Sequence, residues 1–138
     1  MSIDADLVME SLYRVAEISD DPAPGVYSRL FARHPEIEQL FVLDPAGAAR
    51  RNMVVVAVEC LMDYIGGRAS SKNLVVSERI NHANLGVRAE VFDDFFIAIR
   101  DAFGDLLGAE WTAETQRAWT EAIASLTASR GFVPSAGS

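Results

Sequence analysis

The two histidines of this chain, His34 and His82, are its most specialised candidates for chemistry. His82 lies four residues before Gly86, and the Gly86-Val87 pair is expected to end a short helix and turn the chain beside the imidazole. This geometry would leave one face of His82 open to a large, flat ligand. A neutral imidazole there can ligate a metal, and the alternative is a helix-terminal side chain whose charge suits the helix dipole. His34 precedes Pro35 and is expected to be a corner residue without a ligand role.

The elements that must position His82 are predicted to be helices throughout. Apolar residues recur at helical spacing in several segments, and alternating strand patterns are absent. Prolines and glycines separate the segments at positions typical of helix ends. The sequence therefore predicts an all-α fold, with helices over residues 6–18, 25–33, 36–41, 48 to 64 or 65, a short stretch around 82, 89–107, and from a cap at Thr112 through 126.

Three segments need a separate interpretation. Val54-Val55-Val56 suits a strand locally, but the apolar segment continues through Met62 without a turn signal, so its length favours a helix. Residues 68–73 are polar and are predicted to be irregular. Residues 131–138 show no pattern that predicts order, and they are expected to form a disordered tail.

Size and charge limit the kind of protein. The chain has 138 residues, enough for a single domain over 1–138 with one sizeable core. Half of the residues are hydrophobic and 23% are charged, which favours a compact fold. The formal net charge is −8, so attraction to nucleic acid or to an anionic membrane surface is not expected.

The sequence also bears on location and redox chemistry. The first residues have no basic segment followed by an apolar one, so no export signal is visible. The longest apolar stretch, residues 53–58, is too short to span a bilayer. A cytoplasmic protein is expected. Cys60 is the only cysteine, which excludes an intrachain disulfide and predicts a small packing residue.

Three ordered segments resemble the globin family, especially neuroglobin and bacterial single-domain haemoglobins. Residues 24–41, with their Tyr27, His34-Pro35 and Phe41, resemble the second and third globin helices. Residues 82–87 resemble the proximal helix and its corner, and residues 107–114 with Ala118-Trp119 resemble the opening of the last helix. The resemblance spans nearly the whole chain and implies a globin-like helical fold that binds haem b and a diatomic gas.

The resemblance assigns roles to individual residues. His82 would be the proximal iron ligand, Phe41 would wedge against the haem plane, and Tyr27 would lie on the distal side. Arg50 would occupy the distal gate, with Val54 and Val58 one and two turns further along the same face. A slip of one residue, which would place Arg51 or Ala49 at the gate, stays open. The implied haem-contacting set is Phe41, Val54, Val58, Leu85, Val87 and Phe92, with Arg50, Arg51, Arg79 and Arg88 as partners for the propionates.

The chain also departs from its relatives. No histidine or glutamine lies near the gate, so a five-coordinate ferrous site is expected. Flavohaemoglobins polarise their proximal histidine with a tyrosine and a carboxylate, whereas here Phe92 takes the tyrosine position and the last helix has no acid after Glu121. The backbone carbonyl of Glu78 is then the natural acceptor for the imidazole, and His82 would be a modest electron donor.

The resemblance implies reversible binding of dioxygen, nitric oxide or carbon monoxide. The role would be oxygen storage or delivery, or nitric oxide dioxygenation with a separate reductase. Only the dioxygenation would make the protein an enzyme. The alternative is a globin-like signalling or interaction protein that acts in trans or without haem. The segments Ala89–Leu107 and Thr112–Leu126 are candidates for a homodimer face.

Overall fold

The computed structural model describes residues 4–68 and 70–128, and these residues form helices without a strand among them. The all-α prediction is therefore confirmed. The predicted tail over residues 131–138 lies outside the described residues. In chain order the elements are α1 (Ala5–Ile18), α2 (Ala23–Arg33), the 3-10 helix η1 (Pro35–Phe41), α3 (Ala48–Ile65), α4 (Ser70–Asn84), α5 (Ala89–Leu107), the 3-10 helix η2 (Gly108–Glu110) and α6 (Ala113–Thr127).

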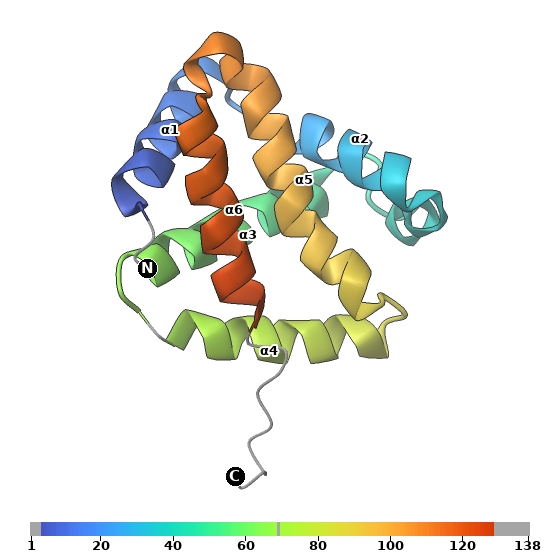
Figure 1. The fold of residues 1–138 in the computed structure, drawn as a ribbon. Coiled ribbons are helices and arrows are strands. Elements are labelled where there is room, and N and C mark those ends of the chain that lie inside the picture. The colour runs from blue at the N-terminus through green and yellow to red at the C-terminus, as the bar shows by residue number, and fades with distance from the viewer. Residues whose placement is uncertain (1–3, 69, 129–138) are drawn as a thin grey trace, which may run out of the picture.

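Helix α5 is the organising element of the fold (Figure 1). It forms an antiparallel pair with α6 through η2, and α2 and α1 pack against it. Helices α3 and α4 follow one another in the chain, and both cross the α5–α6 pair. The result is two layers of crossing helices with α4 along one end of the molecule. None of the described helices is both long and apolar enough to cross a membrane.

The end of the molecule opposite α4 is a filled aromatic core. Trp119 of α6 is fully buried, and its ring centroid lies 5.7 Å from those of both Phe103 and Trp111. The Trp119 indole N–H donates to Oγ of Ser11 at 2.8 Å, which ties α6 to α1. Ser11 in turn donates to the carbonyl of Val8, so this buried network is complete.

Helix α3 forms over the valine triplet, as its length predicts. Asp44 caps it from the preceding loop, because its carboxylate accepts from the backbone N–H groups of Ala49 and Arg50. These hydrogen bonds lower the pKa of Asp44, with the Ala49 amide as the largest cause.

Helix α4 is longer than predicted. Residues 70–73 are helical, so the expectation of an irregular segment over 68–73 is wrong for most of its length. The polar composition of this segment is misleading because Ser71, Val75 and Arg79 form a buried stripe against neighbouring helices. Packing of such a stripe, rather than local propensity, stabilises most helices in proteins.

The turn after His82 forms as its residues predict. Gly86 adopts a positive φ of 92°, and the amides of Leu85 and Val87 donate back to the carbonyl of His82 at 3.0 and 2.9 Å. A residue with a side chain would be strained at that φ, so glycine closes α4 beside the imidazole.

Candidate functional site

A cavity of about 320 Å³ lies between α2, η1, α3, α4 and α5. This volume falls within the range of roughly 300–1,000 Å³ that small-molecule sites occupy. Most of its walls are apolar, with a few polar side chains among them. The lining residues are Tyr27, Leu30, Ile37, Leu40, Phe41, Asn52, Met53, Val56, Ala57, Cys60, Leu74, Val75, Glu78, His82, Val87, Val91, Phe92, Phe95 and Phe96.

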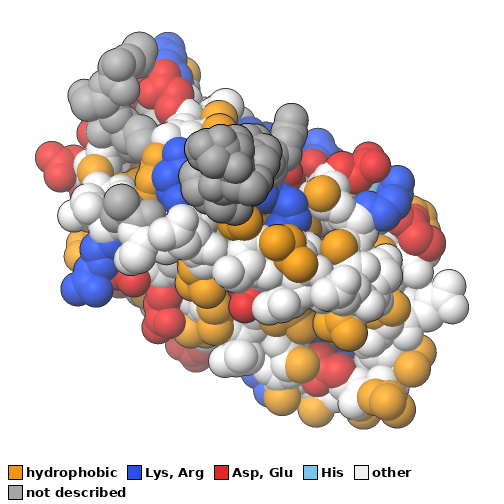
Figure 2. All heavy atoms as spheres, turned by 90° about the horizontal axis from the view of Figure 1, so that it is seen from below, with side chains coloured by type: hydrophobic (Ala, Val, Ile, Leu, Met, Phe, Trp, Pro, Cys, Tyr) orange, Lys and Arg blue, Asp and Glu red, His pale blue; other side chains and the backbone are white. Residues whose placement is uncertain are grey.

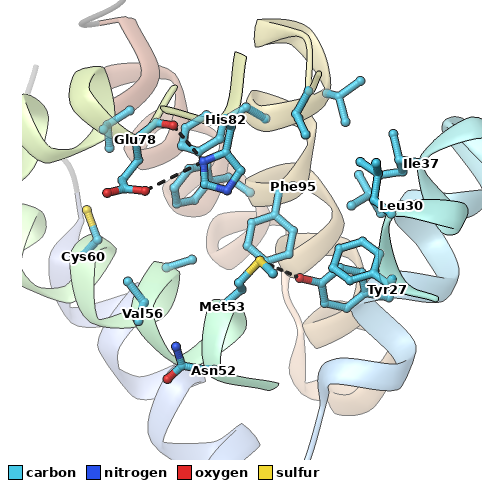
Figure 3. Close-up of a pocket in the computed structure, with 18 of the residues that line it drawn as sticks. Tyr27, Leu30, Ile37, Asn52, Met53, Val56, Cys60, Glu78, His82 and Phe95 are labelled. Atoms are coloured by element: carbon cyan, nitrogen blue, oxygen red, sulfur yellow. Dashed lines mark hydrogen bonds and ion pairs between the residues drawn. The ribbon is translucent and has the colours of Figure 1, made fainter. Parts of the chain in front are cut away.

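His82 enters this cavity from α4 with a defined proton position. Its Nδ1 lies 2.7 Å from the backbone carbonyl oxygen of Glu78. A carbonyl can only accept, so Nδ1 is the donor, and the neutral form of this imidazole has its lone pair on Nε2. Figure 3 shows this second nitrogen on the side of the ring that faces Met53 and Phe95. The predicted acceptor for the imidazole is thus confirmed, and the second ring nitrogen faces an apolar space.

The ring plane of His82 is also supported by packing. Phe92 of α5 lies with its centroid 5.1 Å from that of the imidazole. Phe92 in turn contacts Phe96 edge-on at 6.1 Å. Phe92 takes the position where flavohaemoglobins have a tyrosine, and it packs against the imidazole without offering a hydroxyl group to it.

A carboxylate stands near the same imidazole. Oε1 of Glu78 lies 3.8 Å from Nδ1 of His82, in addition to the hydrogen bond from the backbone of the same residue. The Glu78 side chain is 42% exposed and lines the cavity. The sequence prediction considered an acid only in the last helix, although the position of Glu78 four residues before His82 also places a carboxylate beside the imidazole.

Tyr27 faces the cavity from the opposite wall. It is 3% exposed, and its hydroxyl donates to Sδ of Met53 at 3.6 Å (Figure 3). Burial raises the pKa of Tyr27, so the phenol keeps its proton at neutral pH. The Tyr27 ring packs against Phe41 and Phe95 with centroids 5.3 and 5.5 Å away, which fixes its direction.

The sulfur of Met53 is a weak acceptor. The Tyr27 hydroxyl therefore has a partner that it can exchange for a stronger one at little cost.

The cavity face of α3 differs from the predicted one. Met53, Val56, Ala57 and Cys60 line the cavity, together with Asn52. Val54 is instead 3% exposed in the core, and Val58 packs partly buried against that core. The assignment of Val54 and Val58 to the cavity is corrected: they belong to the face of α3 that neighbours the cavity face.

The physical reason is that α3 is apolar on two sides. Positions 53, 56, 57 and 60 and positions 54, 57, 58 and 61 both follow helical spacing with apolar residues. Either set keeps Glu59 out of the cavity, and Glu59 is exposed in the structure. The exclusion of Glu59 from the cavity therefore could not decide between the two faces of α3.

Arg50 is held away from the cavity. Its Nε lies 3.1 Å from Oδ2 of Asp44, and Nη2 donates to the Asp44 carbonyl at 2.6 Å. Its guanidinium sits over the outer side of the Phe41 ring, 5.9 Å from the centroid. Arg51, the alternative, donates to the Ala46 carbonyl at 2.9 Å. Neither arginine lines the cavity, and neither does Ala49, so none of the three predicted gate candidates belongs to the cavity wall, and the gate assignment stays a prediction.

Arg79 is also committed elsewhere. It is 8% exposed, and its Nη2 donates to Asp93 at 2.8 Å and to the Thr127 carbonyl at 3.1 Å. These contacts join α4 to α5 and α6, and a cation already paired with the partly buried Asp93 is a poor partner for a propionate, which is the role that was predicted for Arg79. Arg88 pairs with Glu90 and Glu36 at the surface.

Leu85 does not line the cavity either. It is 72% exposed, because the turn at Gly86 carries it to the outside of the corner. Of the predicted set, the structure brings Tyr27, Phe41, His82, Val87 and Phe92 together around the cavity.

Cys60 lies in the cavity wall as a neutral group. Burial raises the pKa of its thiol, and its Sγ lies 3.7 Å from the Ser71 carbonyl. The predicted packing role fits this position.

Several apolar residues of the cavity wall reach the surface of the molecule. Leu40, Val56 and Leu74 line the cavity while 52%, 45% and 43% exposed, so apolar surface continues from its walls to solvent. On the α4 side of the molecule, Figure 2 shows many hydrophobic side chains (orange) over the lower right, with charged groups more frequent along the upper and left edges.

These features define a helical protein with an imidazole directed into an apolar cavity. The globin family model matches residues 25–129, and the chain belongs to the globin family. It is therefore, in general terms, a haem-binding and gas-binding globin. Among proteins of curated function, none matches this sequence.

The residues present fit haem. A single imidazole nitrogen suits a metal that brings its other ligands with it, as the iron of haem does. The apolar and aromatic walls suit the faces of a large flat ring, and the half-exposed apolar mouth allows one edge of such a ring to reach solvent.

Proposed function

We propose that this globin binds haem b with His82 as the proximal iron ligand and reversibly holds a diatomic gas, dioxygen or nitric oxide, on the other side. The observation that carries the proposal is the hydrogen bond between His82 and the Glu78 backbone. Its Nδ1 is engaged by the Glu78 carbonyl at 2.7 Å, which leaves the Nε2 lone pair facing an apolar cavity.

Several residues would hold the ring in place. Phe41, Val87 and Phe92 from the predicted set, with Phe95 and Val56, offer it apolar contact. Held through the imidazole of His82, haem would supply reversible binding of a small gas molecule. The apolar walls would exclude water from the cavity, which would slow oxidation of the iron.

Tyr27 would be the distal hydrogen-bond donor. Its buried hydroxyl faces the cavity and is occupied only by the Met53 sulfur at 3.6 Å. A gas ligand with partial negative charge is a stronger acceptor than a thioether, so the hydroxyl would turn to it. Such a hydrogen bond contributes about 1 kcal/mol net. Met53, rather than Arg50, is then the α3 residue whose contact with the Tyr27 hydroxyl the gas ligand would replace.

Further features belong to the same proposal. A bacterial-type haemoglobin in the cytoplasm would use such a site for oxygen storage or delivery, or for nitric oxide dioxygenation with a separate reductase. The homodimer through Ala89–Leu107 and Thr112–Leu126, and the alternative of a haem-free interaction protein, stay predictions.

The test is the visible spectrum of the purified protein with and without His82. We expect a Soret band that shifts with carbon monoxide, and we expect His82→Ala to lose most of the haem. His34→Gln is the matched control, because His34 bonds to Asp94 at 2.8 Å outside the cavity. Full haem retention in His82→Ala, with an unchanged spectrum, would exclude the proximal assignment. A wild-type protein that takes up no added hemin would favour the haem-free alternative.

A further inference from the structure

The single N–H of His82 faces two oxygen acceptors that belong to one residue. The Glu78 backbone carbonyl lies 2.7 Å from Nδ1, and the Glu78 carboxylate lies 3.8 Å from the same atom (Figure 3). The carbonyl is within hydrogen-bond distance and the carboxylate is not. The two groups therefore act differently: the carbonyl orients the ring, and the carboxylate acts through its charge.

We infer that the Glu78 carboxylate is a positioning residue that tunes the haem iron through His82, by making the imidazole a stronger electron donor and favouring the oxidised iron. This inference rests on the proposed function, because it needs His82 as the iron ligand. It also reverses the expectation of a modest donor. That expectation followed from Phe92 and from the lack of an acid late in the last helix, whereas the acid here comes from the helix of His82 itself.

The charge of Glu78 is not neutralised by a neighbour. Among the described residues no arginine or lysine forms an ion pair with it, and the adjacent Arg79 is taken by Asp93 at 2.8 Å. A negative charge beside the proton of a metal-bound imidazole increases the basicity of that ligand. Because the carboxylate is 42% exposed, solvent screens the effect. A charge at about 4 Å in a water-like dielectric changes an equilibrium constant by up to about fivefold.

The side chain can be tested apart from the tether. The 2.7 Å hydrogen bond uses the backbone of Glu78, so Glu78→Gln removes the charge and leaves the ring orientation in place. In the haem-loaded protein we expect a higher midpoint potential, equivalent to a change of up to about fivefold in the reduction equilibrium. We also expect a lower iron–histidine stretching frequency by resonance Raman spectroscopy. The difference from the wild type should shrink as salt is added.

Two further variants make the result specific. Glu59→Gln makes the same change of charge at an exposed position of α3 outside the cavity, and we expect no shift. Glu78→Asp keeps the charge but draws it back by one methylene, and we expect a smaller shift in the same direction.

Three results would overturn the inference. The first is a Glu78→Gln protein that holds haem with the potential and stretching frequency of the wild type. The second is an equal shift in Glu59→Gln, which would reduce the effect to net charge. The third is loss of haem from Glu78→Gln while Glu78→Asp matches the wild type in both measurements, which would leave Glu78 a purely structural role. In all three cases the wild type still binds haem through His82, so failure of the proposed function is a separate result.

Discussion

Two aromatic regions of this globin are built from similar residues, but one is a filled core and the other borders a cavity. At the α1–α5–α6 end, Phe103, Trp111 and Trp119 pack with centroids 5.7 Å apart and fill the core. Around the cavity, Tyr27, Phe41 and Phe95 pack at 5.3 and 5.5 Å, yet a space of about 320 Å³ remains beside them. Ring spacing therefore does not distinguish a closed core from a binding site.

The polar groups among the rings do distinguish them. The indole N–H of Trp119 donates to Ser11 at 2.8 Å and that of Trp111 to Gln116 at 2.7 Å, both to strong oxygen acceptors. In the cavity, the Tyr27 hydroxyl has only a sulfur at 3.6 Å, and one nitrogen of His82 faces the apolar space. A region whose polar groups are weakly engaged is ready to engage a ligand, and a region whose polar groups are satisfied is not.

The largest expected effect separates the two regions by stability. Trp119→Ala should lower the free energy of unfolding of the haem-free protein by about 3–5 kcal/mol, because it empties a filled core and leaves Ser11 without its donor. Phe95→Ala should cost less, because Phe95 is only partly buried and already borders a cavity. Urea denaturation of both variants measures the difference. Equal losses would mean that the cavity wall is as tightly packed as the core.

The second prediction tests the corrected face of α3 with adjacent valines. Val55 and Val56 are 51% and 45% exposed, but only Val56 lines the cavity. Val56→Asp should weaken haem binding by about tenfold or more, since a charge against an apolar ring is poorly solvated. Val55→Asp should bind like the wild type. Hemin titration measures both affinities. Equal weakening would contradict the assignment of Val56, and not Val55, to the cavity face of α3.

The smallest effect concerns the Tyr27 hydroxyl. Tyr27→Phe should speed dissociation of dioxygen by about fivefold, the equivalent of one net hydrogen bond of about 1 kcal/mol. The stability of the haem-free protein should hardly change, because the variant loses only a weak bond to Met53. Stopped-flow measurement of dissociation tests this prediction. An unchanged rate would show that the hydroxyl stays on the sulfur when the ligand is bound.

Much of the local structure near the site followed from sequence. The helix over 89–107 begins and ends where it was predicted, between Arg88 and Gly108. The Gly86 turn and the bond from His82 to the Glu78 carbonyl were also predictable, because each joins groups within four residues of one another. Thr112 caps α6 by accepting from the Thr115 amide at 3.1 Å, again a local contact.

The predictions that differ from the structure concern arginines whose partners the sequence did not indicate, and a helix with two equally apolar faces. Arg79 is a candidate for the propionates in the sequence, but in the structure it binds Asp93 and the Thr127 carbonyl, which are 14 and 48 residues away. Arg50 was a candidate for the gate until the loop placed Asp44 against it. On α3 two apolar faces competed, and no local rule separated Val54 from Met53.

The sequence by itself determined the all-α fold, most of the helix ends and the hydrogen bond between His82 and the Glu78 carbonyl, because short-range hydrogen bonds and backbone preferences decide these. The tertiary structure alone decided which face of α3 meets the cavity, which arginines are paired with carboxylates and that, within residues 4–68 and 70–128, no arginine or lysine pairs with the Glu78 carboxylate. Those outcomes depend on how whole helices cross one another. The energy of such a crossing is the sum of many contacts, and no single stretch of the chain contains it.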